Sequence, residues 1–405
     1  MNTGRFARWI LAFTLSGYPV VTGISQMLRL ENRLISITSR AVVLALALLT
    51  ILCALRSRLF RDGYFWIAWW CFWILYVSRI GIDYISNPET LKLPTYEYFA
   101  FAVGVSLIPA VAMAAGNPAR IAQGAPATLI WVTTLGLLLN LWIIFLQVGS
   151  ISALHFKWLR AEHKALNPIT IGHMGVTLFL LCLWELRFGS FRSVISRVIY
   201  RALLCLAIVL SIVAIIAAGS RGPVISLFLA LSVLAFFRGT RMFNIWSVLV
   251  VTALAIVIWW FASQGESILL AKRLSNVFLD SGRENLLAHG FRSFIDSPIV
   301  GVGINPTKTY PHNLVLESFM AFGVFTGVPF TFLLVYATVK ALQLARLQPN
   351  CLWVTLLFVQ YSVAGMFSGA LSFSSALWVL MVLVVALVKA ELPQQGDLQR
   401  TPQIG

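Results

Sequence analysis

The chain has 405 residues, of which 59% are hydrophobic and only 11% are charged. An ordinary soluble domain has about 25% charged residues, so this composition excludes that class and indicates a protein that lies in a membrane. The formal net charge of +16 would suggest nucleic-acid binding in a soluble protein. In a membrane protein, basic loops that contact acidic headgroups account for much of this charge, and no nucleic-acid partner is expected.

Apolar runs of about twenty residues, the length that crosses the hydrocarbon core, recur along the chain. They predict about twelve membrane-spanning helices, near residues 8–27, 36–55, 64–84, 95–115, 126–147, 169–187, 198–218, 222–237, 243–262, 314–338, 351–368 and 372–390. The fold class is therefore predicted to be an all-α polytopic membrane protein. Its predicted layout is helices 1–9 in residues 1–262, a large loop in 263–311, helices 10–12 in 312–391 and a cytoplasmic tail in 392–405.

The short loops predict the orientation, because an excess of arginine and lysine marks the cytoplasmic side of a membrane protein. With a cytoplasmic amino terminus, the loops on that side carry Arg5, Arg8, Arg56, Arg58, Arg61, Arg120, Arg187, Arg192, Arg197, Arg201, Arg238, Arg241, Lys340 and Arg346. Both termini are then cytoplasmic, and the long 263–311 segment lies on the outer face. The first segment has no A-x-A-like cleavage site, so it is predicted to be a retained helix.

Two arginines lie near predicted outer ends of spans. Arg79 is a buried-charge candidate whose expected partner is Asp83, one helical turn further on. Arg221 lies in the tight turn 219–223 between two spans, where snorkelling to headgroups would account for it. The second interpretation of Arg221 is anion binding, because the turn leads into a helix amino terminus and the planar guanidinium matches phosphate oxygens.

The outer segment 263–310 is polar in an otherwise apolar chain. Within it, residues 281–284 predict a turn, followed by a short helix on the membrane surface. Arg283 is either a solvated charge paired with a neighbouring acid or part of an anion site, and the same choice holds for Lys272 and Arg273. The glycine-containing stretch 297–303 then predicts an irregular return towards the membrane.

The segment ends at Pro311-His312-Asn313, directly before the apolar helix that begins at Leu314. Either His312 or Asn313 is expected to cap this helix. A lone histidine at such a place is commonly structural. Its chemical alternative is a general base, because the positive end of a helix disfavours a charged imidazolium ring. Further along, Gly323 and Gly327 are expected on one helix face, where they would allow close helix packing.

Three short motifs resemble those of the bacterial O-antigen ligase family. His312, Asn313, Gly323 and Thr326 fit the pattern H-[NSQ]-x9-G-x-x-[GTY]. Residues 219–222 resemble an arginine-bearing S-R-G turn of the ligase and polymerase superfamily. Residues 281–283 resemble its loop S-G-R element, which is followed by a P-[LI]-x-G-x-G stretch, here 298–303. The aromatic residue often found after the loop arginine is missing, since Asn-Leu-Leu stands at 285–287.

This resemblance implies a GT-C-like glycosyltransferase on the periplasmic side of a bacterial inner membrane. Such enzymes transfer a glycan from undecaprenyl diphosphate to an acceptor hydroxyl, with inversion, without a metal and without a cofactor. In the ligase the acceptor is lipid A–core oligosaccharide, and the pathway is lipopolysaccharide biosynthesis. The outer loops also have no D-x-D pair that would hold magnesium over a diphosphate.

The resemblance also suggests roles for individual residues. His312 would deprotonate the acceptor hydroxyl, while Arg221 and Arg283 would stabilise the charge on the departing diphosphate. Asn313 would orient the histidine ring or the donor sugar. A further hypothesis assigns contacts with phosphates of the acceptor lipid to Lys157, Arg160, Lys272 and Arg273. The alternative for the basic, aromatic segment 155–164 is an interfacial helix seated in membrane lipids by its tryptophan.

Two alternative functions stay open at this point. A polymerase that extends glycan repeats, or a protein O-glycosyltransferase of the same superfamily, shares the donor and leaving group and differs only in the acceptor. A transporter of an anionic lipid-linked sugar belongs to another class, and it would be expected to have ionisable residues deep in several spans. Few were expected here: Arg79 with Asp83, and Glu185 near an inner end.

Overall fold

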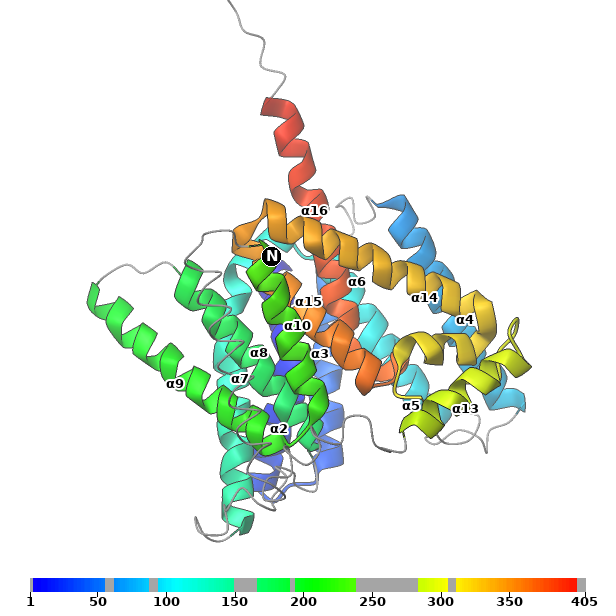
Figure 1. Ribbon diagram of the computed structural model, residues 1–405, viewed down its shortest axis with the longest axis horizontal. Helices are drawn as coiled ribbons and strands as arrows, with labels where there is room; N and C mark the ends of the chain where they lie inside the picture. Colours follow the sequence, from blue (N-terminus) through cyan, green and yellow to red (C-terminus); the bar gives the residue numbers. More distant parts are fainter. Residues whose placement is uncertain are drawn as a thin grey trace, which may run out of the picture.

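The computed structural model describes residues 3–54, 62–86, 94–148, 166–189, 194–237, 283–304 and 311–398. Within these ranges the ordered elements are helices, with no β-strand (Figure 1). Eight of the helices are long and apolar enough to cross a membrane. The protein is therefore an all-α, multi-pass membrane protein, which confirms the predicted fold class.

The elements follow one another with these bounds: α1 Thr3–Ala12, η1 Phe13–Gly17, α2 Tyr18–Met27, α3 Asn32–Ala54, α4 Gly63–Ser86, α5 Thr95–Phe99, η3 Ala100–Leu107, α6 Ile108–Ala115, α7 Pro118–Val148, α8 Pro168–Phe188, α9 Val194–Ala218, α10 Arg221–Phe237, α13 Arg283–Asp296, α14 Leu314–Leu347, η5 Pro349–Cys351, α15 Leu352–Phe367, η6 Leu371–Phe373 and α16 Ser375–Leu398. The elements η1 and η3 are π-helical, whereas η5 and η6 are 3₁₀ turns.

Most predicted spans correspond to helices of the structure. The first is one continuous helical run, α1–η1–α2, with a π-helical segment in its middle. The predicted spans 222–237 and 372–390 correspond to apolar stretches of fewer than 18 residues, Arg221–Phe236 in α10 and Ser375–Ala390 in α16. The predicted span 243–262 lies outside the described residues.

An aromatic cluster joins α4, α14 and α16 at the centre of the bundle. The indole rings of Trp73 and Trp378 have centroids 4.8 Å apart, and Phe72 and Phe330 pack around them. These side chains are almost fully buried. Large rings make many dispersion contacts within a bundle, where no hydrophobic driving force distinguishes protein from lipid.

Small residues let α8 approach α9 and α10 closely. A Cβ at Gly172 would come 2.6 Å from the ring of Pro223 and 3.0 Å from the Cβ of Ala218, and one at Gly175 would come 2.8 Å from the carbonyl oxygen of Ser211. Packing of backbone against backbone through such residues is typical of membrane helices. It holds the α9–α10 turn, which carries Arg221, tightly against α8.

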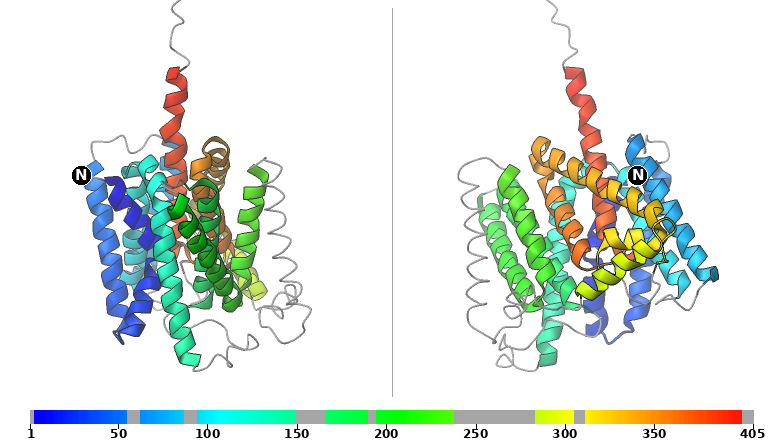
Figure 2. Two further views of the ribbon diagram at one scale, coloured as in Figure 1. Left: turned by 90° about the vertical axis from the view of Figure 1, so that its left-hand side faces the viewer. Right: turned by 45° about the vertical axis from the view of Figure 1, so that its right-hand side comes forward.

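The two ends of the bundle differ in what they carry. The amino terminus and the carboxyl end of α16 lie towards one end, whereas the α9–α10 turn and α13 lie towards the other (Figures 1 and 2). The arginine turn and the loop helix therefore share an end of the molecule, away from the termini. Which of the two ends is cytoplasmic stays a prediction.

Candidate functional site

Helix α14 is broken about a quarter of the way along. Phe322 has φ −142° and ψ 39°, and Gly323 has φ 57° and ψ −144°, a conformation open essentially only to glycine. The expectation that Gly323 and Gly327 share one face of a straight helix is therefore wrong. The helix is interrupted at Gly323, while Gly327 packs against the ring of Phe319.

The loop before α14 satisfies the backbone groups that this break exposes. The amide of Val302 donates to the carbonyl of Met320 (2.8 Å), and the amide of Val324 donates to the carbonyl of Pro298 (2.9 Å). Gly301 has φ 63°, and a Cβ there would lie 2.5 Å from the carbonyl oxygen of Met320. The predicted irregular return is thus a docking loop, residues 297–304, that fits the break in α14.

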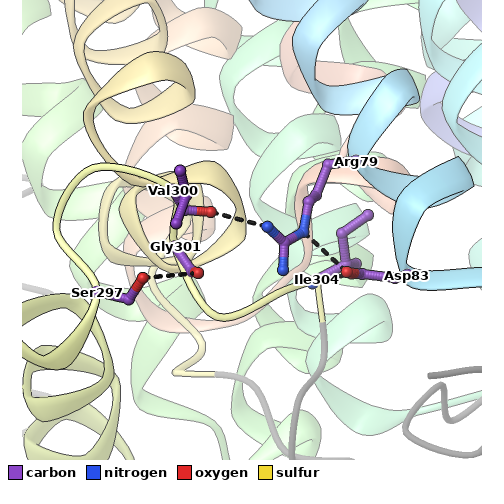
Figure 3. Close-up of polar contacts among 6 residues, drawn as sticks. All are labelled: Arg79, Asp83, Ser297, Val300, Gly301 and Ile304. Atoms are coloured by element: carbon purple, nitrogen blue, oxygen red, sulfur yellow. Dashed lines mark hydrogen bonds and ion pairs between the residues drawn. The ribbon is translucent and has the colours of Figure 1, made fainter. Parts of the chain in front are cut away.

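An ion pair fastens the docking loop to α4 (Figure 3). Arg79 Nε donates to Asp83 Oδ1 (2.8 Å), and Arg79 also donates to the carbonyl of Val300 (2.8 Å). The other carboxylate oxygen, Oδ2, accepts the amide of Ile304 (2.7 Å). Within the loop, the hydroxyl of Ser297 donates to the carbonyl of Gly301 (3.0 Å). The predicted Arg79–Asp83 pair is confirmed, and it positions the segment that leads to His312.

The amino terminus of α14 has the expected capped form. Asn313 is the N-cap, because its Oδ1 accepts the amide of Leu316 (3.0 Å). His312 precedes it with φ 53°, a left-handed conformation that is uncommon for a residue other than glycine. One turn into the helix, buried Glu317 accepts the amide of Leu371 with both oxygens (3.0 and 3.1 Å). The end of α14 is thereby tied to the turn before α16.

His312 lines a cavity of about 500 Å³. The wall of this cavity is formed by η1 and the start of α2, by α3, η3 and the start of α8, and by the segment from the end of α15 to the start of α16. Arg40 from α3 and a second histidine, His173 from α8, also line it.

Arg40 and His173 were missed by sequence reasoning. The available signal for Arg40 was an arginine within the predicted span 36–55, since ionisable residues in membrane helices are commonly functional. For His173 no signal distinguished a cavity residue from a packed one. The turn, loop and histidine motifs match a known pattern, whereas these two residues belong to no such motif.

The Arg221 turn lies beside the same cavity. Gly219 has φ 55°, and Arg221 is half-buried at the start of α10. A Cβ at the next residue, Gly222, would come 3.8 Å from Nε2 of His173. Two residues far apart in the sequence, Arg221 and His312, are thus brought to one region through His173.

Arg283 begins α13, which packs on α14 through Gly290 and through the rings of Phe294 and Phe319, 5.1 Å apart. The predicted short helix is therefore confirmed and is longer than expected, while its position on the membrane surface stays a prediction. The side chain of Arg283 lies outside the described residues. So do the proposed acceptor-phosphate contacts Lys157, Arg160, Lys272 and Arg273.

Within the ranges that the structure describes, no three histidine, cysteine, aspartate or glutamate side chains come together as metal ligands. Metal independence of any reaction stays a prediction.

These features define a multi-pass helical membrane protein with a cavity lined by Arg40, His173 and His312. Residues 206–331 match the family model described as O-Antigen ligase, a range that includes Arg221, Arg283 and His312. This match confirms the resemblance seen in the motifs and supports a role of the ligase and polymerase superfamily in polysaccharide assembly. A comparison with curated proteins found no match.

Proposed function

We propose that the protein is an O-antigen ligase. In this proposal it transfers O-antigen glycan from undecaprenyl diphosphate to a hydroxyl of lipid A–core oligosaccharide, as a step of lipopolysaccharide biosynthesis. The site faces the periplasm from the bacterial inner membrane, and both termini are cytoplasmic. The family match over residues 206–331 and the three motifs support the reaction class.

The proposed reaction inverts the configuration of the anomeric carbon. A bond forms between the acceptor oxygen and that carbon, and the bond from the carbon to the diphosphate oxygen breaks. The proton of the acceptor hydroxyl passes to the ring of His312, acting as general base. The electron pair leaves with undecaprenyl diphosphate, whose growing charge Arg221 and Arg283 stabilise through charge-assisted hydrogen bonds.

The observation that carries this proposal is that the Arg221 turn lies beside His173, a residue that lines one cavity with His312. Arg221 and His312 are separated by about ninety residues, yet a Cβ at Gly222 would lie only 3.8 Å from Nε2 of His173, which lines the cavity with His312. A leaving-group stabiliser and a base must act on one substrate, so their convergence is what the chemistry requires. The Oδ1 of Asn313 already accepts the capping hydrogen bond from the amide of Leu316. The side-chain amide nitrogen of Asn313 is the group that would orient the ring or the donor sugar.

Transfer by the purified protein tests the roles of the two residues. His312→Ala should abolish most glycan transfer from an undecaprenyl-diphosphate donor to a core-lipid acceptor. A variant that turns over at the wild-type rate would refute the base assignment. Arg221→Lys keeps the charge and loses the planar fork, so full activity would show that bidentate recognition of the diphosphate is the wrong account. Activity that a chelator abolishes would contradict metal independence.

The competing acceptor is tested in a deletion strain. Loss of all O-antigen from the lipid A–core, seen on a gel, indicates the ligase. A single repeat left on the core indicates the polymerase instead. A transporter would show no transfer in the purified system at all.

A further inference from the structure

Arg40 is a charged side chain placed inside a membrane-spanning helix. It lies five residues after Ile35, where the apolar span of α3 begins, which is about 7–8 Å along a helix that rises 1.5 Å per residue. A span of 20 residues just crosses the hydrocarbon core, so Arg40 lies inside the apolar layer, below the level of the surrounding lipid phosphates. An arginine at this level that faces a cavity is a functional candidate.

Aromatic faces hold the guanidinium in place. Its Cζ lies 4.5 Å from the ring centroid of Phe101 and 5.3 Å from that of Tyr18. Among the described residues, no carboxylate or carbonyl lies within hydrogen-bonding distance of it; the nearby Glu97 pairs instead with Arg33 (3.1 Å). A guanidinium has five N–H donors, so this arrangement orients the charge while leaving its donors for a ligand.

The rings that flank Arg40 come from helices with an unusual local form. Tyr18 directly follows the π-helical segment η1, and Phe101 is part of the π-helical segment η3. Both segments contribute to the wall of the cavity. Segments of π-helix are rare and are frequent at functional sites, so two of them on one cavity are an independent sign of a built site.

His173 is the second polar group without a partner in this cavity. It is 8% exposed, and in the described part of the chain neither of its ring nitrogens has a hydrogen-bond partner. Its ring stacks on that of Tyr361 with centroids 6.5 Å apart. A buried polar group left unsatisfied is costly, whereas a bound ligand that offers an oxygen would satisfy it.

We propose that Arg40 and His173 bind a phosphate-bearing lipid substrate in this cavity. Arg40 contacts a phosphate oxygen, and His173 forms a hydrogen bond to a neighbouring phosphate or sugar oxygen. The inference rests on the proposed function, since the substrates of that reaction are lipids with phosphate groups. The mixed wall suits such a molecule, because phenylalanine and aliphatic residues line the cavity together with Ser39, Thr170 and Ser368.

Two lipids of the proposed reaction carry phosphate, and direct binding distinguishes them. The probes are undecaprenyl diphosphate without sugar and a lipid A–core glycolipid without O-antigen, each titrated into the purified full-length protein in detergent. Arg40→Gln should weaken the binding of one probe by about ten- to one-hundred-fold, as expected when a charge-assisted contact is lost. Weaker diphosphate binding assigns Arg40 to the donor, and weaker glycolipid binding assigns it to the acceptor.

The matched control is Arg33→Gln, on the same helix but exposed, which should leave both affinities unchanged. Equal affinities for Arg40→Gln and the wild type would overturn the proposal. So would equal weakening by Arg33→Gln, or a wild type that binds neither probe. Binding is measured without turnover, so the proposal can hold even if His312→Ala retains full transfer and the assignment of the base fails.

His173→Phe separates ligand binding from a structural role. Phenylalanine keeps a ring to stack on Tyr361 and removes two unpaired nitrogens, so the melting temperature without ligand should stay the same or rise. The affinity for the probe that depends on Arg40 should nevertheless fall several-fold. Unchanged affinity, or a fall in affinity accompanied by a lower melting temperature without ligand, would overturn the part assigned to His173.

Discussion

Replacement of Gly323 by alanine tests whether the break in α14 is built into the protein. With φ 57° and ψ −144°, an alanine at this position would be in a region that costs about 1–3 kcal/mol. Its Cβ would also collide with the backbone of Pro298 and Ile299 in the docking loop, and such overpacking costs about 1–3 kcal/mol more. The total of about 2–6 kcal/mol is large against a typical folding stability of 5–15 kcal/mol.

Relaxation of the backbone would not avoid this cost. If Gly323→Ala straightened the helix, the Val302–Met320 and Val324–Pro298 hydrogen bonds would be lost. Each such bond is worth about 0.5–1.5 kcal/mol net. The docking loop would then detach from α14 and leave the segment before His312 without its support.

Thermal unfolding in detergent and glycan transfer measure the two consequences. Gly323→Ala should melt well below the wild type and transfer glycan more slowly. The control is Gly81→Ala in the interior of α4, where the nearest atom to a new Cβ is 4.0 Å away and the backbone is helical. That variant should be neutral or slightly more stable. Equal melting temperatures and rates for the two variants would refute the account of the break.

Three further variants probe other contacts. Asp83→Asn should lower stability by about 3–5 kcal/mol, because it leaves its buried arginine partner without a counter-charge; thermal unfolding measures this. Glu317→Leu should lower stability by about 1–3 kcal/mol, since the amide of Leu371 loses its acceptor. Glu317→Gln keeps one acceptor oxygen, so its melting temperature should lie between those of Glu317→Leu and the wild type. Tyr336→Phe removes a 2.6 Å hydrogen bond to Asp62 at the other end of the bundle, so it should lower the melting temperature without changing the rate of transfer.

Each of these has an outcome that would count against it. Arg33→Gln breaks the exposed ion pair with Glu97, and this should lower stability by only about 0–1 kcal/mol. A loss of stability as large as that of Asp83→Asn would contradict the idea that burial makes the Arg79–Asp83 pair important. Glu317→Gln melting below Glu317→Leu would contradict the assigned acceptor role. A Tyr336→Phe variant that transferred glycan slowly would show that the two ends of the bundle are coupled.

Much of the fold could be predicted because a bilayer imposes simple rules. Every backbone group in the hydrocarbon core must be satisfied internally, so long apolar runs become helices. The capped start of α14 was also predictable, because an asparagine before an apolar run caps a helix through a local hydrogen bond. The Arg79–Asp83 pair followed from helical spacing alone. In each case the relevant partners lie within a few residues of one another.

The break at Gly323 could not be predicted in the same way. Read along the chain, Gly323 and Gly327 look like a packing face, because glycine allows both close helix contact and a positive φ. Which of the two applies depends on the docking loop, whose amide and carbonyl groups replace the lost helical hydrogen bonds. That partner comes from a segment whose contact with α14 has no sequence signature.

The sequence by itself determined that this protein is a helical membrane protein, and its short motifs indicated the O-antigen ligase superfamily. Hydrophobic length and local spacing are properties of contiguous residues, so they can be recognised in the sequence without knowledge of the packing. Only the tertiary structure brought Arg40 and His173 to the cavity that His312 lines, beside the Arg221 turn. A cavity is formed by side chains from several helices at once, and their meeting depends on how the helices pack.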